Sequence, residues 1–145
     1  MLFRSYQQLN HRANQLAHYL QTLGVKPEVL VGICVERSLE MVVGLLGILK
    51  AGGAYVPLDT SYPQQRLVYM VQDAQAQIIL TQESLRQTLP VGAAQLVYLD
   101  TDWSIVAQQS DAQLSTAVTV ENLAYAIYTS GSTGQIGRGR VGKEC

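Results

Sequence analysis

The chain has 145 residues, of which 48% are hydrophobic and 14% are charged, and its formal net charge is -1. This length fits one modest domain with a sizeable apolar core. Because Lys and Arg are scattered, no basic field exists to hold a nucleic acid backbone or an anionic membrane surface, so neither partner is expected. The two cysteines, Cys34 and Cys145, lie far apart with no metal-ligand spacing, which indicates neither disulfides nor a zinc site.

The start of the chain shows no pattern of a secretory signal, because Arg4 to His11 is polar where an apolar segment is needed. The longest apolar stretch, Met41 to Leu49, is much shorter than the roughly 20 residues that span a bilayer. Together with the cysteine usage, these features predict a cytoplasmic protein whose Cys34 is a small core residue.

Apolar residues recur at three- and four-residue spacing from Tyr6 to Leu23, which predicts an amphipathic helix with both histidines on its solvated side. Leu30 to Val35 is apolar at odd and even positions, as in a strand buried on both faces. Ser38 is the expected N-cap of a deeply buried helix from Leu39 to Ala51, and Gly52 is its expected stop.

The second half of the chain continues the alternation of strands and helices. Ala54 to Leu58 predicts a strand, and Pro63 begins a third helix. Further strands are predicted at Ile78 to Thr81, Gln95 to Leu99 and Ala124 to Tyr128, with weaker helical signals at Ser84 to Leu89 and Trp103 to Gln109.

This order predicts an α/β fold with a mostly parallel sheet and flanking helices, in which ligands bind beyond the carboxyl ends of the strands. The composition changes at Gln135, after which apolar residues nearly vanish and Gly and Arg alternate. We therefore divide the chain into a domain portion, residues 1–134, and a Gly/Arg-rich tail, residues 135–145, that is expected to be disordered.

The residues that point to chemistry follow directly after the last apolar strand. Glycines allow close backbone approach, while successive N-H groups and hydroxyls offer neutral donors to phosphate oxygens. The segment is a candidate phosphate-binding loop for a nucleotide, and its residues are Thr129, Ser130, Gly131, Ser132, Thr133 and Gly134.

Two other interpretations compete with this one. Ser/Thr/Gly-rich segments also form plain flexible turns, although the position after a strand favours phosphate binding. Further on, Gly137 and Gly142-Lys143 have Walker A spacing, but Glu144 stands where a magnesium-binding Ser or Thr is required. We interpret the Walker A spacing as a chance match.

At this loop the sequence resembles a known family. AYAIYTSGSTG, Ala124 to Gly134, is similar to the phosphate-loop signature of the adenylate-forming (AMP-binding) superfamily. Two further segments resemble the first two motifs of nonribosomal peptide synthetase adenylation domains: Ser5 to Ala17 and Glu36 to Leu67. Within the second, the sequence LKAGGAYVPLD, Leu49 to Asp59, is unusual in acyl-CoA synthetases. The resemblance implies an incomplete N-terminal subdomain of an amino-acid adenylation domain.

By this resemblance, the complete domain would convert ATP and an amino acid to an aminoacyl adenylate and pyrophosphate. It would then load the acyl group onto the phosphopantetheine thiol of a carrier protein domain. Thr129 to Gly134 would hold the β- and γ-phosphates, with Ser132 and Thr133 in direct contact and Thr133 beside Mg²⁺. The C-terminal part of the adenylation domain is the other implied partner.

The chain departs from the family pattern at three positions. Gln8 and Thr60 replace a usual glutamate and proline, and Gly137 stands where the loop lysine is expected. No catalytic residue is assigned, and the isolated chain is expected to be inactive. The alternative is a catalytically silent remnant or interaction module of an interrupted synthetase gene, with apolar faces exposed for a partner.

The remaining carboxylates have no base or metal ligand at an interpretable spacing. We interpret them as turn and cap residues. They are Asp59, Asp73, Asp100 and Asp102.

Overall fold

The computed structural model describes residues 5–89, 92, 94–116, 118–128 and 136–140. These residues form one six-stranded sheet in the order β4-β3-β1-β2-β5-β6, and all neighbouring strands are parallel except β5 and β6. The strands are β1 (Leu30–Ile33), β2 (Ala54–Pro57), β3 (Ile78–Thr81), β4 (Gln95–Tyr98), β5 (Leu123–Tyr128) and β6 (Ile136–Arg140).

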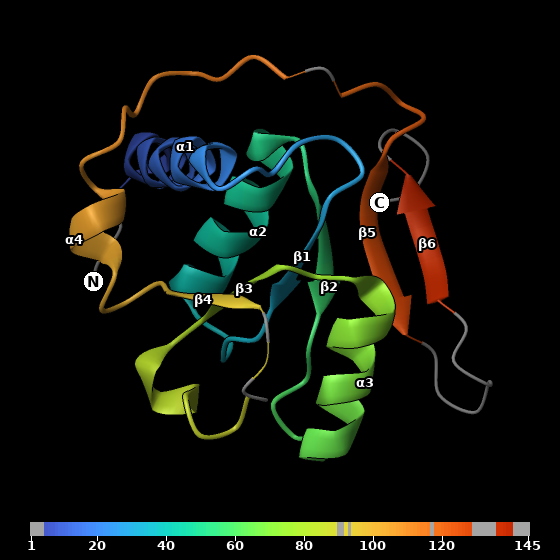
Figure 1. The fold of residues 1–145 in the computed structure, drawn as a ribbon. Helices are drawn as coiled ribbons and strands as arrows, with labels where there is room; N and C mark the ends of the chain where they lie inside the picture. The colour runs from blue at the N-terminus through green and yellow to red at the C-terminus, as the bar shows by residue number, and fades with distance from the viewer. Residues whose placement is uncertain (1–4, 90–91, 93, 117, 129–135, 141–145) are drawn as a thin grey trace.

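The chain winds in both directions from the central strand β1. Helix α2 (Leu39–Ala51) connects β1 to β2, and α3 (Gln64–Ala74) then leads back across to β3 on the other side of β1. Figure 1 shows α1 (Tyr6–Thr22) beside α2, with α3 set apart from both. The predicted α/β class with a mostly parallel sheet is confirmed.

Helices α1 and α2 pack closely because α2 presents glycine to α1. A side chain at Gly47 would place its Cβ 2.6 Å from a methyl carbon of Leu16, so only glycine fits without displacement. Ser38 caps α2 by accepting a hydrogen bond from the Met41 N-H at 3.3 Å, and Gly52 ends the helix at a φ of 97°. Both predicted ends of this helix are confirmed.

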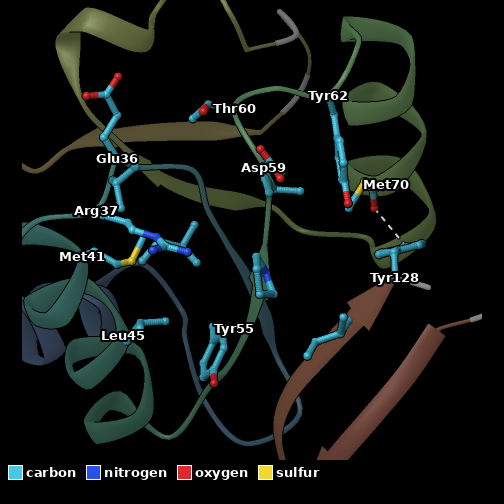
Figure 2. Close-up of a pocket in the computed structure, with 15 residues that line it drawn as sticks. Glu36, Arg37, Met41, Leu45, Tyr55, Asp59, Thr60, Tyr62, Met70 and Tyr128 are labelled. Atoms are coloured by element: carbon cyan, nitrogen blue, oxygen red, sulfur yellow. Dashed lines mark hydrogen bonds between the residues drawn. The ribbon is translucent and has the colours of Figure 1, made fainter. Parts of the chain in front are cut away.

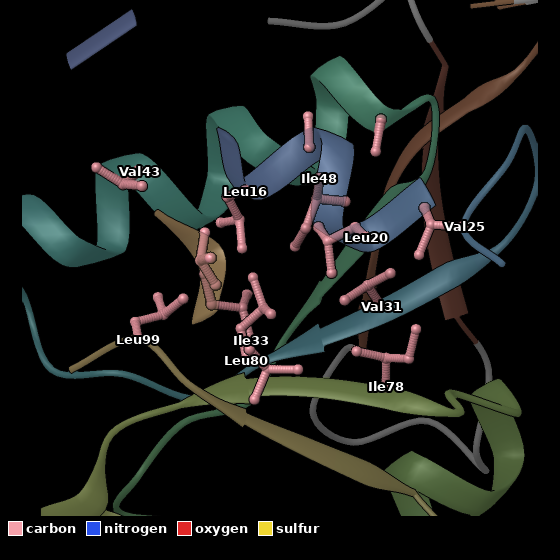
Figure 3. Close-up of a cluster of buried hydrophobic side chains, with 14 of the residues drawn as sticks. Leu16, Leu20, Val25, Val31, Ile33, Val43, Ile48, Ile78, Leu80 and Leu99 are labelled. Atoms are coloured by element: carbon pink, nitrogen blue, oxygen red, sulfur yellow. The ribbon is translucent and has the colours of Figure 1, made fainter. Parts of the chain in front are cut away.

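Successive residues of each strand point to opposite faces of the sheet, and their side chains pack into two separate cores. On β3, Ile78 and Leu80 face the helices α1 and α2, whereas Ile79 faces α3. Figure 3 shows the first core, in which side chains of α1 and α2 meet those of β1 and β3. Cys34 is fully buried in the second core, as its apolar surroundings in the sequence predict.

The polar side of α1 is covered by the connection that leads from α4 (Trp103–Val106) toward β5. Asn14 donates to the carbonyl of Asp111 at 2.9 Å, and a ring nitrogen of His18 lies 3.0 Å from the Ala112 carbonyl oxygen. Both histidines lie partly exposed on the polar side of α1, as predicted, and both contact this connection: His11 Nδ1 is 3.7 Å from Asp111 Oδ2.

The weaker helical signals produced short elements only. The first is a 3-10 turn at Glu83–Leu85, and the second is the one-turn helix α4. Within the tail that was expected to be disordered, the structure pairs Ile136–Arg140 with β5 in antiparallel register; residues 141–145 lie outside the described residues. Among the described helices, none has both the length and the apolarity to cross a membrane.

Candidate functional site

A cleft of about 790 Å³ lies at the carboxyl ends of β1, β2 and β5. In a doubly wound sheet this is the edge where ligands bind, because the loops after neighbouring strands diverge there. Figure 2 shows side chains from these loops, from α2 and from α3 around it. They are Ile33, Val35, Glu36, Arg37, Met41, Leu45, Tyr55, Pro57, Leu58, Asp59, Thr60, Tyr62, Met70, Ile127 and Tyr128.

The β1–α2 loop brings a cation to this cleft. The loop is held because the Glu36 N-H donates to Gln82 Oε1 at 3.0 Å and Gln82 Nε2 donates to Glu40 at 2.7 Å. In the part of the chain that the structure describes, the Arg37 guanidinium makes no hydrogen bond or ion pair. Figure 2 shows it pointing into the cleft, whereas the Glu36 carboxylate points away from it. Arg37 therefore remains available to an anionic ligand.

The loop after β2 contributes a carboxylate that is occupied by its own turn. Asp59 Oδ1 accepts hydrogen bonds from the Ser61 N-H at 2.8 Å and the Ser61 hydroxyl at 2.7 Å. These bonds lower the pKa of Asp59. Burial, followed by the charge of Asp59, raises the pKa of the Cys34 thiol to about 11. Cys34 is thus a neutral core thiol at neutral pH.

Three of the four carboxylates interpreted as turn and cap residues have that role. Besides Asp59, Asp100 accepts from the Thr101 N-H at 2.8 Å, and Asp102 accepts from the Tyr98 N-H at 2.9 Å. For Asp73 the prediction is wrong, because its Oδ2 lies 2.7 Å from the Tyr128 hydroxyl instead. The partner is 55 residues away, so no local pattern indicates it.

One side of the cleft is aromatic and apolar. Tyr55 of β2 stacks on Tyr125 of β5 with ring centroids 5.8 Å apart, and burial, followed by Tyr125, raises the pKa of Tyr55. Ile127 is 45% exposed on the same strand as the buried Ala126. The α2-facing side of β5 therefore lacks the helical cover that α3 gives to the other side.

The predicted phosphate-loop residues Thr129, Ser130, Gly131, Ser132, Thr133 and Gly134 lie outside the described residues. The structure does place their flanks: Tyr128 pairs with Ile136 across β5 and β6, and Tyr128 lines the cleft. Within the described ranges, no group of three or more His, Cys, Asp or Glu residues is placed to bind a metal ion.

Sequence reasoning missed Arg37, Tyr55 and Tyr62 as residues of the candidate site. The first follows β1 at the edge where ligands are expected, so the position rule for parallel sheets could have indicated it. The tyrosines gave no such signal, because aromatic residues in or near strands are usually core or packing residues.

A doubly wound sheet with a cleft at its carboxyl edge is an architecture common among α/β proteins that bind nucleotides. A family model described as "AMP-binding enzyme" matches residues 3–135. The chain belongs to this family, which confirms the resemblance seen in its motifs.

The most similar curated proteins include peptide synthases. The chain is 58% identical over 130 residues to a linear gramicidin synthase protein of Brevibacillus parabrevis, a match that covers 90% of the chain and 2% of that protein. It is 54% identical over 134 residues to chondramide synthase cmdD of Chondromyces crocatus, covering 90% of the chain and 3% of that protein. The chain thus spans only a small part of each relative.

Solved structures agree with the fold. The crystal structure of the nonribosomal peptide synthetase FmoA3 matches with a TM-score of 0.85 and 34% identity, covering 96% of this chain and 15% of that one. A Mycobacterium tuberculosis fatty acyl CoA synthetase has a TM-score of 0.83 at 18% identity, which shows a shared fold alone.

Proposed function

We propose that this chain forms the part of an amino-acid adenylation domain that holds the pyrophosphate end of ATP in nonribosomal peptide synthesis. The observation that carries the proposal is the pairing of Tyr128, which lines the cleft at the carboxyl edge of the sheet, with Ile136. In the sequence these two residues flank the Ser/Thr/Gly segment. The relatives are synthases of peptides, and one related FmoA3 structure is described as bound to AMPPNP.

The residues available suit a magnesium nucleotide. Thr129 to Gly134 offer hydroxyl and backbone donors, and Arg37 adds a cation whose charge no described residue neutralises by direct contact. Mg²⁺ would neutralise part of the phosphate charge, with Thr133 as its candidate protein ligand. Asp59 is occupied by Ser61, so its carboxylate is less available to the metal.

In the complete domain, the amino-acid carboxylate would attack the α-phosphorus, and pyrophosphate would leave with the negative charge that develops. The role of this part of the protein is to hold that leaving group in line and to meet its charge with fixed donors. The acyl group would then pass to the phosphopantetheine thiol of a carrier domain. Since this chain holds only the leaving-group end, we expect it to be inactive alone.

A chimeric adenylation domain tests the proposal. Residues 1–134 replace the matching segment of an adenylation domain from the linear gramicidin synthase protein that is 58% identical over the aligned region. We expect the chimera to catalyse amino-acid-dependent pyrophosphate exchange, and Ser132→Ala plus Thr133→Ala to lower kcat/KM for ATP by about 100-fold, the loss expected for two removed phosphate donors.

The matched control is Ser115→Ala plus Thr116→Ala, which removes two consecutive exposed hydroxyls that do not line the cleft. The control pair should leave kcat/KM unchanged. Equal losses in the two double variants, or full exchange by the Ser132/Thr133 variant, would contradict the assignment of the loop. Exchange by the isolated 145-residue chain would contradict its expected inactivity.

The second candidate, an interaction module, is favoured by exposed apolar residues along one stripe of α2. Leu39, Val42 and Leu49 follow each other at helical spacing and are 45%, 39% and 37% exposed. Sedimentation of the chain over a concentration series tests it, with Val42→Glu plus Leu49→Glu as the disrupting variant. A monomer at all concentrations would count against self-association through this stripe.

A further inference from the structure

Tyr128, the residue that immediately precedes the predicted phosphate loop, is held by α3. Its hydroxyl lies 2.7 Å from Asp73 Oδ2 and 3.1 Å from the Met70 carbonyl oxygen. Its ring meets Tyr69 edge-on, with centroids 6.3 Å apart and planes at 74°, and the residue is only 9% exposed. Figure 2 shows the bond to Met70 at the tip of β5.

The same residue closes the hairpin on which the loop is built. Tyr128 pairs with Ile136 in the antiparallel register of β5 and β6. These two residues flank the predicted loop in the sequence, so a displacement of Tyr128 relative to α3 would also displace its partner Ile136.

We propose that Asp73 and the Met70 carbonyl hold Tyr128 as a positioning residue for the phosphate loop, an inference that rests on the proposed function. A phenol buried this deeply needs a partner for its O-H, and a carboxylate acceptor makes the stronger kind of hydrogen bond. A binding loop gains affinity when its ends are already fixed before the ligand arrives. In this proposal Tyr128 acts by fixing the end of β5 from which the loop starts.

The first test is residue-resolved amide hydrogen exchange on the 145-residue chain with Tyr128→Phe, which keeps the ring and removes the hydroxyl. We expect about tenfold faster exchange at residues 127, 128, 136 and 137, the loop end of the hairpin, and no change at Leu123, its far end. Unchanged rates at the loop end, or an equal acceleration throughout the sheet, would overturn the proposal.

Changes at Asp73 separate the hydrogen bond from packing. Asp73→Asn keeps a neutral oxygen that accepts from the Tyr128 hydroxyl, so it should accelerate loop-end exchange less than Asp73→Leu does. Asp73→Leu should accelerate exchange at the same residues as Tyr128→Phe, by less than Tyr128→Phe because the Met70 carbonyl remains as an acceptor. The matched control is Tyr125→Phe, on the same strand, whose ring stacks on Tyr55 and which lies outside the cleft lining. If exchange at residues 127, 128, 136 and 137 is accelerated in Tyr125→Phe but not in Asp73→Leu, the proposal that Asp73 holds Tyr128 is excluded.

Calorimetric titration with magnesium and ATP then tests whether the contacts of Tyr128 with Asp73 and Met70 affect nucleotide affinity. If the wild-type chain binds, Tyr128→Phe should weaken the affinity about tenfold while Tyr125→Phe leaves it unchanged; equal affinities would overturn the positioning role. If the wild-type chain does not bind, phosphate binding by this chain is refuted, and the exchange rates still decide whether α3 fixes the base of the loop.

Discussion

The two sides of strand β5 differ in what covers them. Ala126 and Tyr128 point to the α3 side, where they are 0% and 9% exposed, whereas Ile127 points to the other side and is 45% exposed. The α1–α2 layer that covers β1 and β3 does not extend over this side of β5, and Ile127 here contributes to the lining of the cleft. The buried residues of the covered side contribute to the stability of the fold, whereas Ile127 on the open side remains half exposed to solvent.

The largest expected effect is the loss of stability on truncating a core side chain, compared with the same truncation on the open side of β5. Leu16→Ala removes a fully buried side chain that packs on Gly47 and should lower the free energy of unfolding by about 3 kcal/mol. Ile127→Ala should lower it by less than about 0.5 kcal/mol, since this side chain is already half solvated. Urea denaturation measures both; similar losses would contradict the difference between the two sides.

The second effect concerns the thiol buried beneath α3. Burial and the charge of Asp59 raise the pKa of Cys34 from 9.0 to about 11, so the folded chain holds this proton more tightly than the unfolded chain. The resulting stability is complete below about pH 9 and declines as the pH rises toward 11, by about 2 kcal/mol in total.

Urea denaturation of wild type and Cys34→Ala from pH 7 to 11 measures how much the ionisation of Cys34 changes the free energy of unfolding. The other titrating groups are common to both proteins, so their effects cancel in the comparison. The stability of wild type should decline more steeply above pH 9 than that of the variant. If the free energies of unfolding of the two proteins fall in parallel with pH, the pKa of Cys34 is not raised by folding, which would contradict the structure.

The smallest effect is expected at the N-terminus of α2. Ser38→Ala removes the N-cap of α2 and should lower the free energy of unfolding by about 1 kcal/mol. Ser38→Asp retains a capping oxygen and adds a negative charge at the helix N-terminus, so it should match wild type. Thermal unfolding distinguishes the two variants. Equal destabilisation by both would mean that the cap contributes nothing.

The sequence predicted the parallel strands and the three longer helices because each has a local signal. Period, capping residue and glycine stop all agree for α2, whose bounds Leu39–Ala51 were predicted without error. The short turn at Glu83–Leu85 was predicted too long, since a few apolar residues do not separate one turn from a helix.

Contacts between residues far apart in the sequence could not be predicted, because no local sequence pattern indicates them. The bonds of α1 to residues 107–112 and of Asp73 to Tyr128 depend on the completed fold, as does the pairing of β6 in a segment without apolar periodicity. The same holds for the site: Thr129 to Gly134 were selected from residue type, whereas Arg37 enters the cleft only through the topology of the sheet.

The most direct test of phosphate-centred binding is a calorimetric comparison of ATP, GTP and AMP, each with magnesium, on the wild-type chain. We expect weak binding of ATP and GTP with nearly equal affinity, much weaker binding of AMP, and loss of binding in Ser132→Ala plus Thr133→Ala but not in Ser115→Ala plus Thr116→Ala. This result follows because the residues proposed to bind the nucleotide, Thr129 to Gly134, are hydroxyl and backbone donors suited to phosphate oxygens. Tight, adenine-selective binding that survives the Ser132/Thr133 changes would place the nucleotide elsewhere and contradict the account.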